Sequence, residues 1–324
     1  MPEPVEKLGD CGETANGSEK TPGTALIGEV RRAGWRRVAR GVYVPAAEPS
    51  TVERDAHGWR CLLGDEVTFT GLTGAALRGW WLPTLPRDLP TYVAISDQDP
   101  RPRRVGLRVA RHRERIPSVR LKGLAAATPA ETILSCARLL SLLDLVILTD
   151  AALHMGDCTE ADLRLAAGQR RRGARGLRRA LPMVDCRSES PGETLLRLLH
   201  TSSGISVEPQ YVVVATDRII ARADLRITGT RRLPEYDGAH HRVAAQYEQD
   251  RRREGRLRAL GWEPYSYSTA SVLREPVRIL RDADEALGRP HVPQRIKGFY
   301  DLLNASSYTK AGAGQLRARI AVDD

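Results

Sequence analysis

The sequence predicts a mixed α/β protein of 324 residues, in which helical and β-rich segments occur in both halves of the chain. Three observations predict this fold class. Apolar residues recur with the period of a helix in some segments and with the period of a strand in others. The segment from Ser190 to Tyr267 has the order α-β-β-β-α-β. A separate mixed α/β region precedes it, and the chain is long enough for two or three domains.

The α-β-β-β-α-β segment opens with a helix that begins at Ser190-Pro191-Gly192-Glu193. Serine is a favoured N-cap and proline suits the first helical position. Three β-rich runs follow, at residues 211–214, 218–227 and 231–233. A charged helix pattern from about residue 242 to 260 leads to a closing strand at residues 261–267.

The first half of the chain carries shorter signals. A helix is expected over Leu26–Val30, a hairpin-like step at residues 40–44, and a helix of small residues within 69–83. Strands are expected at residues 93–96 and 107–110, around a turn at 98–102. Single helices are expected over 130–154 and over 159–180, and further helices at 270–287 and 299–320.

These patterns divide the chain into five parts. The parts are a disordered polar tail (1–22), an N-terminal region (23–128), a helical connector (129–186), the α-β-β-β-α-β domain (187–288) and a C-terminal helical tail (289–324). The tail is expected to be disordered because it is rich in glycine, proline and polar residues.

Three carboxylates fall near the edges of the predicted strands. Asp224 and Glu235 lie on neighbouring strand ends, and Asp237 projects on the same side as Glu235 because side chains alternate along a strand. Two carboxylates that face one point offer the hard oxygen ligands that Mg²⁺ prefers. A metal held there can activate water and neutralise charge on a phosphate. Asp224 and Glu235 are therefore the predicted Mg²⁺ ligands.

The same residues resemble a known family. Glu193, Asp224, the run Glu235-Tyr236-Asp237-Gly238, His241, Asp250 and Gly261-Trp262 look like the nuclease-type domain related to very-short-patch repair endonucleases, of the PD-(D/E)xK superfamily. The resemblance implies a restriction-endonuclease-like core with a mixed sheet and a Mg²⁺-dependent hydrolysis of DNA. It implies a catalytic set of Glu193, Asp224, Glu235, Asp237 and His241. Asp237 stands where the superfamily usually has lysine, which fits the branch in which histidine serves but also fits an inactive enzyme.

The region before this domain resembles the amino-terminal region of type IV (AbiEi-like) antitoxins. The hairpin-like step at residues 40–44 looks like the wing of a degenerate winged helix, and the helix within 69–83 is similar to the one that follows it in that family. The two resemblances together cover the chain from about Ala25 to Ser268.

Each candidate residue also has a structural explanation. Glu193 completes a capping box with Ser190, so its carboxylate can bond to the Ser190 amide. Asp224 can be an outward-facing strand residue that pairs with Arg222 or Arg226. Asp237-Gly238 is a common turn dipeptide.

Basic residues exceed acidic ones by ten, which favours a partner with negative charge. Arginine offers a planar fork that matches phosphate. The arginines expected to contact DNA share a position near the predicted catalytic helix, strands and connector: Arg197, Arg222, Arg242, Arg170, Arg171 and Arg172. The dense basic run from Arg101 to Arg115 is interpreted as a nucleic-acid face or, with slightly more weight, as a solvated edge.

Five scattered cysteines without CxxC spacing favour free thiols in a reducing compartment, and no signal peptide opens the chain. The expected location is the cytoplasm and the expected partner is DNA, with no membrane association and with a homodimer left open. The expected function is that of a metal-dependent endonuclease. The alternative is a non-catalytic, antitoxin-like DNA-binding regulator that keeps the nuclease fold.

Overall fold

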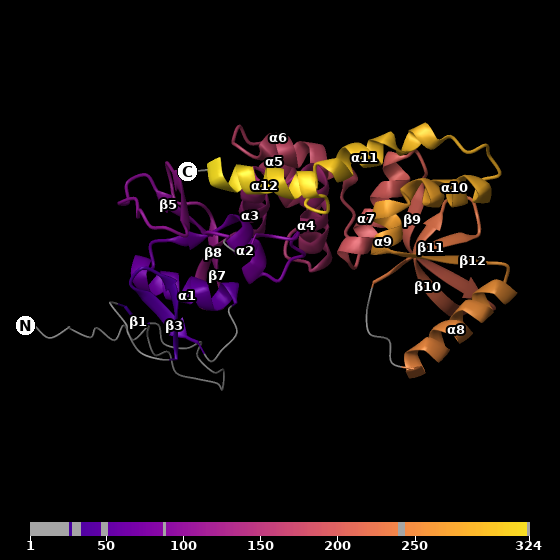
Figure 1. The fold of residues 1–324 in the computed structure, drawn as a ribbon, viewed down its shortest axis with the longest axis horizontal. Helices are drawn as coiled ribbons and strands as arrows, with labels where there is room; N and C mark the ends of the chain where they lie inside the picture. The colour runs from indigo at the N-terminus through magenta and orange to yellow at the C-terminus, as the bar shows by residue number, and fades with distance from the viewer. Residues whose placement is uncertain (1–25, 28–33, 47–50, 87–88, 239–243, 323–324) are drawn as a thin grey trace, which may run out of the picture. The chain divides into compact units, whose positions relative to one another are not determined.

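The computed structural model describes residues 26–27, 34–46, 51–86, 89–238 and 244–322. The chain forms two compact units, described here one at a time (Figure 1). Unit 1 contains Met1–Leu139, Leu165–Ala174 and Arg317–Asp324, and unit 2 contains Leu140–Arg164 and Arg175–Leu316. Residues 129–186 and 289–324, expected as a connector and a tail, are each divided between the two units. The expected tail at 1–22 lies outside the described residues.

A five-stranded mixed sheet forms the centre of unit 1, which confirms the mixed α/β class. Its order is β6-β5-β4-β8-β7, with parallel pairing in β5–β6 and β4–β8 and antiparallel pairing elsewhere. The strands are β4 (Thr68–Phe69), β5 (Thr91–Ser96), β6 (Leu107–His112), β7 (Ser118–Leu121) and β8 (Leu124–Ala127). Helices α1 (Val52–Leu63), α2 (Gly71–Leu77) and α3 (Pro129–Cys136) accompany it.

Buried apolar side chains hold this sheet to its helices. Trp59 of α1 and Phe69 of β4 are each 1% exposed and belong to one core cluster. The small residues of α2 allow close packing: a Cβ added at Gly74 would lie 3.2 Å from the Thr132 side chain of α3. The helix expected within residues 69–83 is therefore present, with a shorter span.

The link between β5 and β6 differs from the expected tight turn. The two strands run parallel, in a register that pairs Thr91 with Leu107 and Ser96 with His112. A chain that starts a parallel strand has to return along the full length of the first one. Residues 97–106 therefore form a long returning link. It contains a turn in which the Asp99 amide donates to the Ser96 carbonyl at 3.2 Å, so the turn expected at 98–102 is confirmed in part and the link is longer than expected.

A hairpin formed by β2 (Trp35–Ala39) and β3 (Val42–Pro45) confirms the step expected at residues 40–44. Gly41 occupies the turn with φ +82°, a conformation that favours glycine. The helix expected at Leu26–Val30 is wrong at its start, where β1 (Leu26–Ile27) pairs with β3 instead.

Both long helices expected in the middle of the chain are interrupted. The first is divided into α3 and α4 (Leu142–His154), because the Ser141 side chain caps a new helix by accepting from the Asp144 amide. The second is divided into α5 (Glu160–Gly168) and α6 (Ala174–Ala180). Gly173, in the break, has φ +91°, and a Cβ there would lie 2.1 Å from the Leu134 carbonyl oxygen. Arg170, Arg171 and Arg172 therefore lie in a loop and not at a helix C-terminus.

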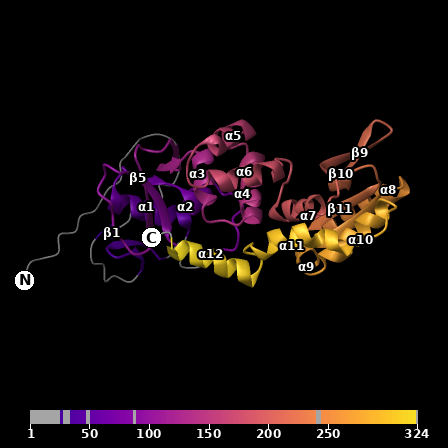
Figure 2. The same cartoon turned by 90° about the horizontal axis from the view of Figure 1, so that it is seen from above.

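Unit 2 contains α7 (Pro191–Ser202), β9 (Val207–Ala215), β10 (Arg218–Ile227), β11 (Arg232–Asp237), α8 (Ala244–Ala259) and β12 (Glu263–Ser268), in the expected order. Figure 2 shows β9 and β10 side by side as a hairpin, and β11 pairs in parallel with β12. Instead of one sheet, these strands form two two-stranded ladders. Pro234 in β11 has no N–H to offer a further ladder.

Shorter helices complete unit 2 and the end of the chain. They are the 3₁₀ helices η1 (Leu181–Met183) and η2 (Pro293–Ile296), and α9 (Thr269–Arg274), α10 (Pro276–Ala286), α11 (Lys297–Asn304) and α12 (Lys310–Val322). The single helices expected over 270–287 and 299–320 are thus each two helices. Pro276 starts α10 at its first turn, where a missing N–H costs nothing.

Candidate active site

Glu193 lies in the first turn of α7, with its side chain almost wholly buried. The Ser190 hydroxyl caps the helix by accepting from the Glu193 amide at 3.2 Å. The Glu193 carboxylate does not bond back to the Ser190 amide: its Oε2 accepts from the Glu189 amide and from Gln210 Nε2, each at 2.8 Å. Glu193 therefore joins the start of α7 to strand β9.

Asp224 lies in β10, between the ladder pairs Ala223–Tyr211 and Leu225–Pro209. This places it level with Gln210 of β9, whose backbone has φ +54°. Asp224 Oδ2 accepts the Tyr236 amide of β11 at 2.7 Å, so this side chain bridges β10 and β11 where no ladder does.

The expected alternative for Asp224, a pair with Arg222 or Arg226, is not formed. Arg222 Nη2 lies 2.8 Å from Glu189 Oε2, and Arg226 Nη1 lies 3.6 Å from Glu208 Oε1. Asp224 is thus half-buried, and its carboxylate bonds to the Tyr236 amide of the next strand and not to an exposed arginine.

Glu235 of β11 forms a two-pronged ion pair with Arg253 of α8. Arg253 Nη2 lies 2.7 Å from Oε1 and Nη1 lies 3.0 Å from Oε2. Arg253 also donates to the Arg222 carbonyl of β10 at 2.8 Å. Both oxygens of Glu235 are therefore engaged, and the pair attaches α8 to the two central strands.

Tyr236 fixes β11 against the start of α7. A Cβ added at Gly192 would lie 2.0 Å from the Tyr236 ring, so only glycine allows this close approach. The Tyr236 hydroxyl hydrogen-bonds to the Thr269 hydroxyl. Because Gly192 precedes Glu193 and Tyr236 follows Glu235, this contact brings the two carboxylate-bearing segments together.

Glu193, Asp224 and Glu235 form what we call the carboxylate cluster. The pKa of Asp224 is raised to about 7, first by burial and then by the charge of Glu193, with a smaller effect from Glu235. The Tyr236 N–H and the Arg253 guanidinium oppose the rise. Burial and the neighbouring carboxylates together disfavour the ionised form of Asp224, and perturbed pKa values of this kind are common at functional sites.

The raised pKa predicts a pH-dependent stability. The pKa of Asp224 rises from 3.8 in the unfolded chain to about 7, so the protonated carboxyl favours folding and this contribution is lost as pH rises through 7. Asp224→Asn is expected to match the wild type near pH 4 and to be about 1–2 kcal/mol more stable at pH 8, after a discount for partial solvent exposure. Urea unfolding with EDTA present measures this difference.

Asp217→Asn is the matched control, because Asp217 is exposed in the β9–β10 turn and its positive φ suits asparagine. Its difference from the wild type is expected to stay flat with pH. A flat difference for Asp224→Asn as well would contradict the proposed charge balance of the cluster.

Two carboxylate oxygens of the cluster have no hydrogen-bond partner among the described residues, and a cation could contact them. Within the described chain, no hydrogen bond occupies Asp224 Oδ1 or Glu193 Oε1, whereas Arg253 takes both oxygens of Glu235. No group of three or more histidine, cysteine or acidic side chains among the described residues is arranged to hold a metal ion. Mg²⁺ commonly takes one or two carboxylates and keeps several waters. Of the expected ligand pair, Asp224 keeps one open oxygen and Glu235 keeps none, whereas Glu193 also has one open oxygen.

Asp237 and His241 complete the predicted catalytic set. Asp237 is the last residue of β11, opposite Ser268 of β12. His241, expected to move protons, lies outside the described residues, as does Arg242.

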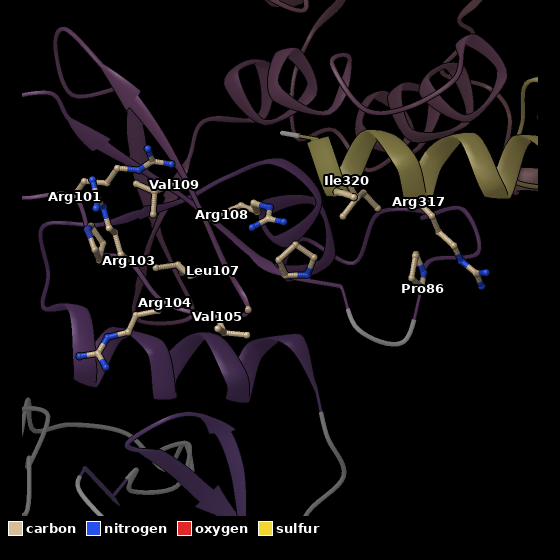
Figure 3. A pocket seen from close by; sticks show the side chains of 14 residues that line it. Pro86, Arg101, Arg103, Arg104, Val105, Leu107, Arg108, Val109, Arg317 and Ile320 are labelled. Atoms are coloured by element: carbon tan, nitrogen blue, oxygen red, sulfur yellow. The ribbon is translucent and has the colours of Figure 1, made fainter. Parts of the chain in front are cut away.

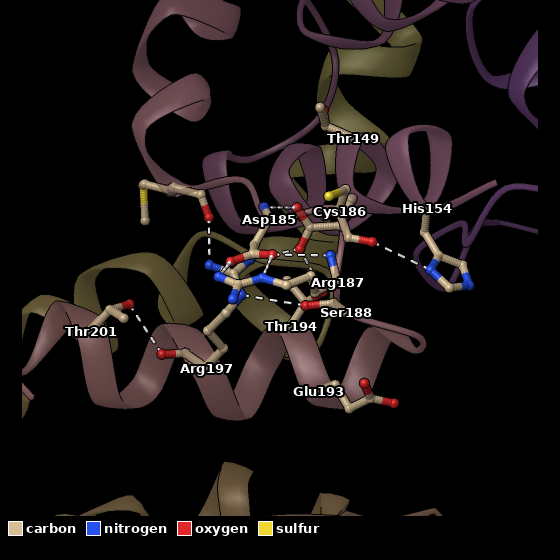
Figure 4. A network of polar contacts seen from close by, with 12 residues as sticks. Thr149, His154, Asp185, Cys186, Arg187, Ser188, Glu193, Thr194, Arg197 and Thr201 are labelled. Carbon is tan, nitrogen blue, oxygen red and sulfur yellow. Dashed lines mark hydrogen bonds and ion pairs between the residues drawn. The ribbon is translucent and has the colours of Figure 1, made fainter. Parts of the chain in front are cut away.

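Arg197 is a correction to the predicted DNA contacts. It is 5% exposed, and its Nη2 lies 2.7 Å from Asp150 Oδ2 (Figure 4). Its Nη1 donates to the Met183 carbonyl at 2.7 Å. Figure 4 shows Glu193 pointing away from this network although it lies on the same helix. A guanidinium held inside unit 2 cannot reach a DNA backbone, so this prediction is wrong.

The other predicted DNA contacts that the structure describes are exposed. Arg222 is 54% exposed and pairs with Glu189 beside the carboxylate cluster. Arg170, Arg171 and Arg172 belong to unit 1, and Arg171 forms a two-pronged pair with Glu131 at 2.6 and 2.8 Å. Arg222 belongs to unit 2, the same unit as the cluster.

Two curated proteins are similar to this chain over nearly their whole length. They are described as uncharacterized proteins MT2308 and Rv2248, from two strains of Mycobacterium tuberculosis. Each is 32% identical over 270 residues, which cover 80% of this chain and 96% of the relative. The chain belongs to their family. No protein-family model and no solved structure matches it.

Two residues that contact the carboxylate cluster are not among the predicted site residues. Arg253 falls within the charged helix pattern of residues 242–260, and Gln210 comes just before the β-rich run at 211–214. The signal for Arg253 is its position on the helix that follows the strand of Glu235. Nothing in the sequence marks Gln210, because its role depends on the register of β9 against β10. Where the structure describes the chain, no helix is long and apolar enough to cross a bilayer.

Proposed function

We propose that this protein binds DNA and hydrolyses its backbone, with the carboxylate cluster of unit 2 as the catalytic centre and Mg²⁺ as cofactor. The observation that supports the proposal is Asp224, whose pKa is raised to about 7 by burial and by the charges of Glu193 and Glu235. Carboxylates gathered from a helix and two strands are what a cation-dependent phosphodiesterase needs.

The arrangement of elements supports the same proposal. The order α7-β9-β10-β11-α8-β12 and the positions of Glu193, Asp224 and Glu235 on it resemble the nuclease-type domain of very-short-patch repair endonucleases. We infer a restriction-endonuclease-like core, with Asp224 joining β10 to β11 in place of a regular ladder. The charge of +10 suits a polyanionic substrate.

The chain's own residues would prepare the centre. Glu193 and Asp224 would hold the cation, which supplies an activated water and neutralises charge on the phosphate. Gln210 and the Glu189 amide orient Glu193, and the Tyr236 amide orients Asp224. Arg253 keeps Glu235 in place through their ion pair and compensates its negative charge. In this proposal His241 handles the proton and Asp237 assists.

Incubation of the purified full-length protein with plasmid DNA and with mismatched DNA tests the proposal. Nicked or linear products are expected with Mg²⁺ and not with EDTA. Mg²⁺ is also expected to raise the midpoint of thermal unfolding of the wild type at pH 8, because a ligand that binds the folded state stabilises it. Absence of both effects would overturn the proposed cofactor and activity.

A second candidate is a DNA-binding regulator that does not cut. The pair between Glu235 and Arg253 favours it, because an acidic residue with both oxygens engaged is not available to a metal. Binding to a promoter fragment that weakens with salt, is unchanged by EDTA and leads to no cleavage would identify this function.

A further inference from the structure

Unit 1 contains a basic cavity that no part of the proposed active site uses. It has a volume of about 1020 Å³, and five arginines but no carboxylate lie among its lining residues (Figure 3). The arginines are Arg101, Arg103, Arg104, Arg108 and Arg317. We call this the arginine cavity.

Most of these guanidinium groups have no partner among the described residues. No hydrogen bond or ion pair joins the side chains of Arg101, Arg103, Arg104 or Arg317 to another residue that the structure describes. The two carboxylates of a neighbouring pocket, Glu66 and Asp99, are paired with Arg115 instead. The positive charge of the arginine cavity is therefore left for a ligand.

The backbone that presents these arginines is restrained. Pro100 and Pro102 alternate with Arg101 and Arg103, and a proline fixes its own φ and keeps the residue before it extended. The link also has to return along the length of β5 to start the parallel strand β6. A segment held extended loses little conformational entropy when its side chains bind.

We propose that the arginine cavity binds phosphate groups of the DNA backbone, as a contact separate from the catalytic centre. Planar guanidinium forks match phosphate oxygens, and unpaired like charges within a Debye length repel one another until an anion neutralises them. The inference rests on the proposed function only for the choice of DNA as the polyanion.

Fluorescence anisotropy of a labelled 30-bp duplex in EDTA tests this inference. The triple variant Arg101→Gln, Arg103→Gln and Arg104→Gln is expected to bind at least about tenfold more weakly at 0.1 M salt. The slope of log affinity against log salt is expected to fall by about 2 to 3, for all duplex sequences alike.

A second triple variant, Arg274→Gln, Arg278→Gln and Arg281→Gln, is the matched control. It removes the same charge from exposed positions in α9 and α10 of unit 2. Its affinity is expected to stay within about threefold of the wild type, because none of these positions lines the arginine cavity. Equal losses in the two variants would overturn the assignment, since they would show an effect of net charge alone. Thermal unfolding confirms that both variants are folded.

Competition between the labelled duplex and free phosphate compounds is the second part of the test. Inorganic pyrophosphate or ATP that displaces the duplex only at millimolar concentration supports a backbone site. Tight binding of ATP that the first triple variant loses, with duplex affinity unchanged, would overturn it in favour of a nucleotide site. If the wild type binds DNA in EDTA but does not cleave it with Mg²⁺, the proposed activity fails. The arginine cavity would then still be supported as a DNA-binding site.

Discussion

Replacement of Asp224 by asparagine is expected to lower the rate of DNA backbone cleavage by at least about 10²-fold, the effect of losing one group that stabilises transition-state charge. The asparagine amide keeps an oxygen for the Tyr236 N–H, so the bridge between β10 and β11 is retained. It removes the charge that lies next to Glu193 and the free oxygen offered to a cation. Single-turnover cleavage with saturating protein measures the loss at the chemical step.

Measurement of duplex affinity in EDTA distinguishes a role of Asp224 in cleavage from a role in DNA binding. Asp224→Asn is expected to bind DNA at least as well as the wild type, because one negative charge is removed near a polyanion. Asp217→Asn removes the same charge from the exposed β9–β10 turn and is expected to cut at the wild-type rate. Cleavage that persists in Asp224→Asn would show that the activity lies elsewhere in the chain.

Replacement of Arg197 by methionine is expected to lower the free energy of unfolding by about 3–5 kcal/mol at pH 8, because it leaves the buried Asp150 carboxylate without its cation. Burial raises the pKa of Asp150 to about 6 even with Arg197 beside it. The variant can escape the cost by protonating Asp150, so the loss is expected to be smaller at pH 5. Urea unfolding at the two pH values measures both.

The neighbouring pair supplies the control. Arg187 pairs with Asp185 but is 55% exposed, so Arg187→Met is expected to cost at most about 1 kcal/mol. The double variant Asp150→Asn with Arg197→Met is expected to recover part of the loss, since the unpaired charge is gone. Equal costs for Arg197→Met and Arg187→Met would contradict the buried role of Arg197.

Local chemistry made parts of unit 2 predictable. Ser190 and Pro191 mark the start of α7, and the alternating residues 218–227 coincide with β10. The carboxylates of Asp224 and Glu235 were expected on neighbouring strands, and the Tyr236 amide that bonds to Asp224 places them there. Their assignment as joint metal ligands remains a prediction.

Features set by distant contacts were not predictable. Arg197 looked like a surface arginine because its partner, Asp150, comes from another helix 47 residues earlier. The break at Gly173 depends on the Leu134 carbonyl, and the direction of β6 depends on its pairing with β5. Helical periodicity carries no information on any of these contacts.

The chain crosses between unit 1 and unit 2 four times, after Leu139, Arg164, Ala174 and Leu316. Neither unit is a single continuous segment of the chain, so division of the chain at one position cannot separate the two units. Exchange of one unit with another protein by a simple fusion at one junction would therefore leave both partners incomplete. A change in specificity in this family is thus expected to arise by substitution within each unit rather than by shuffling of whole modules.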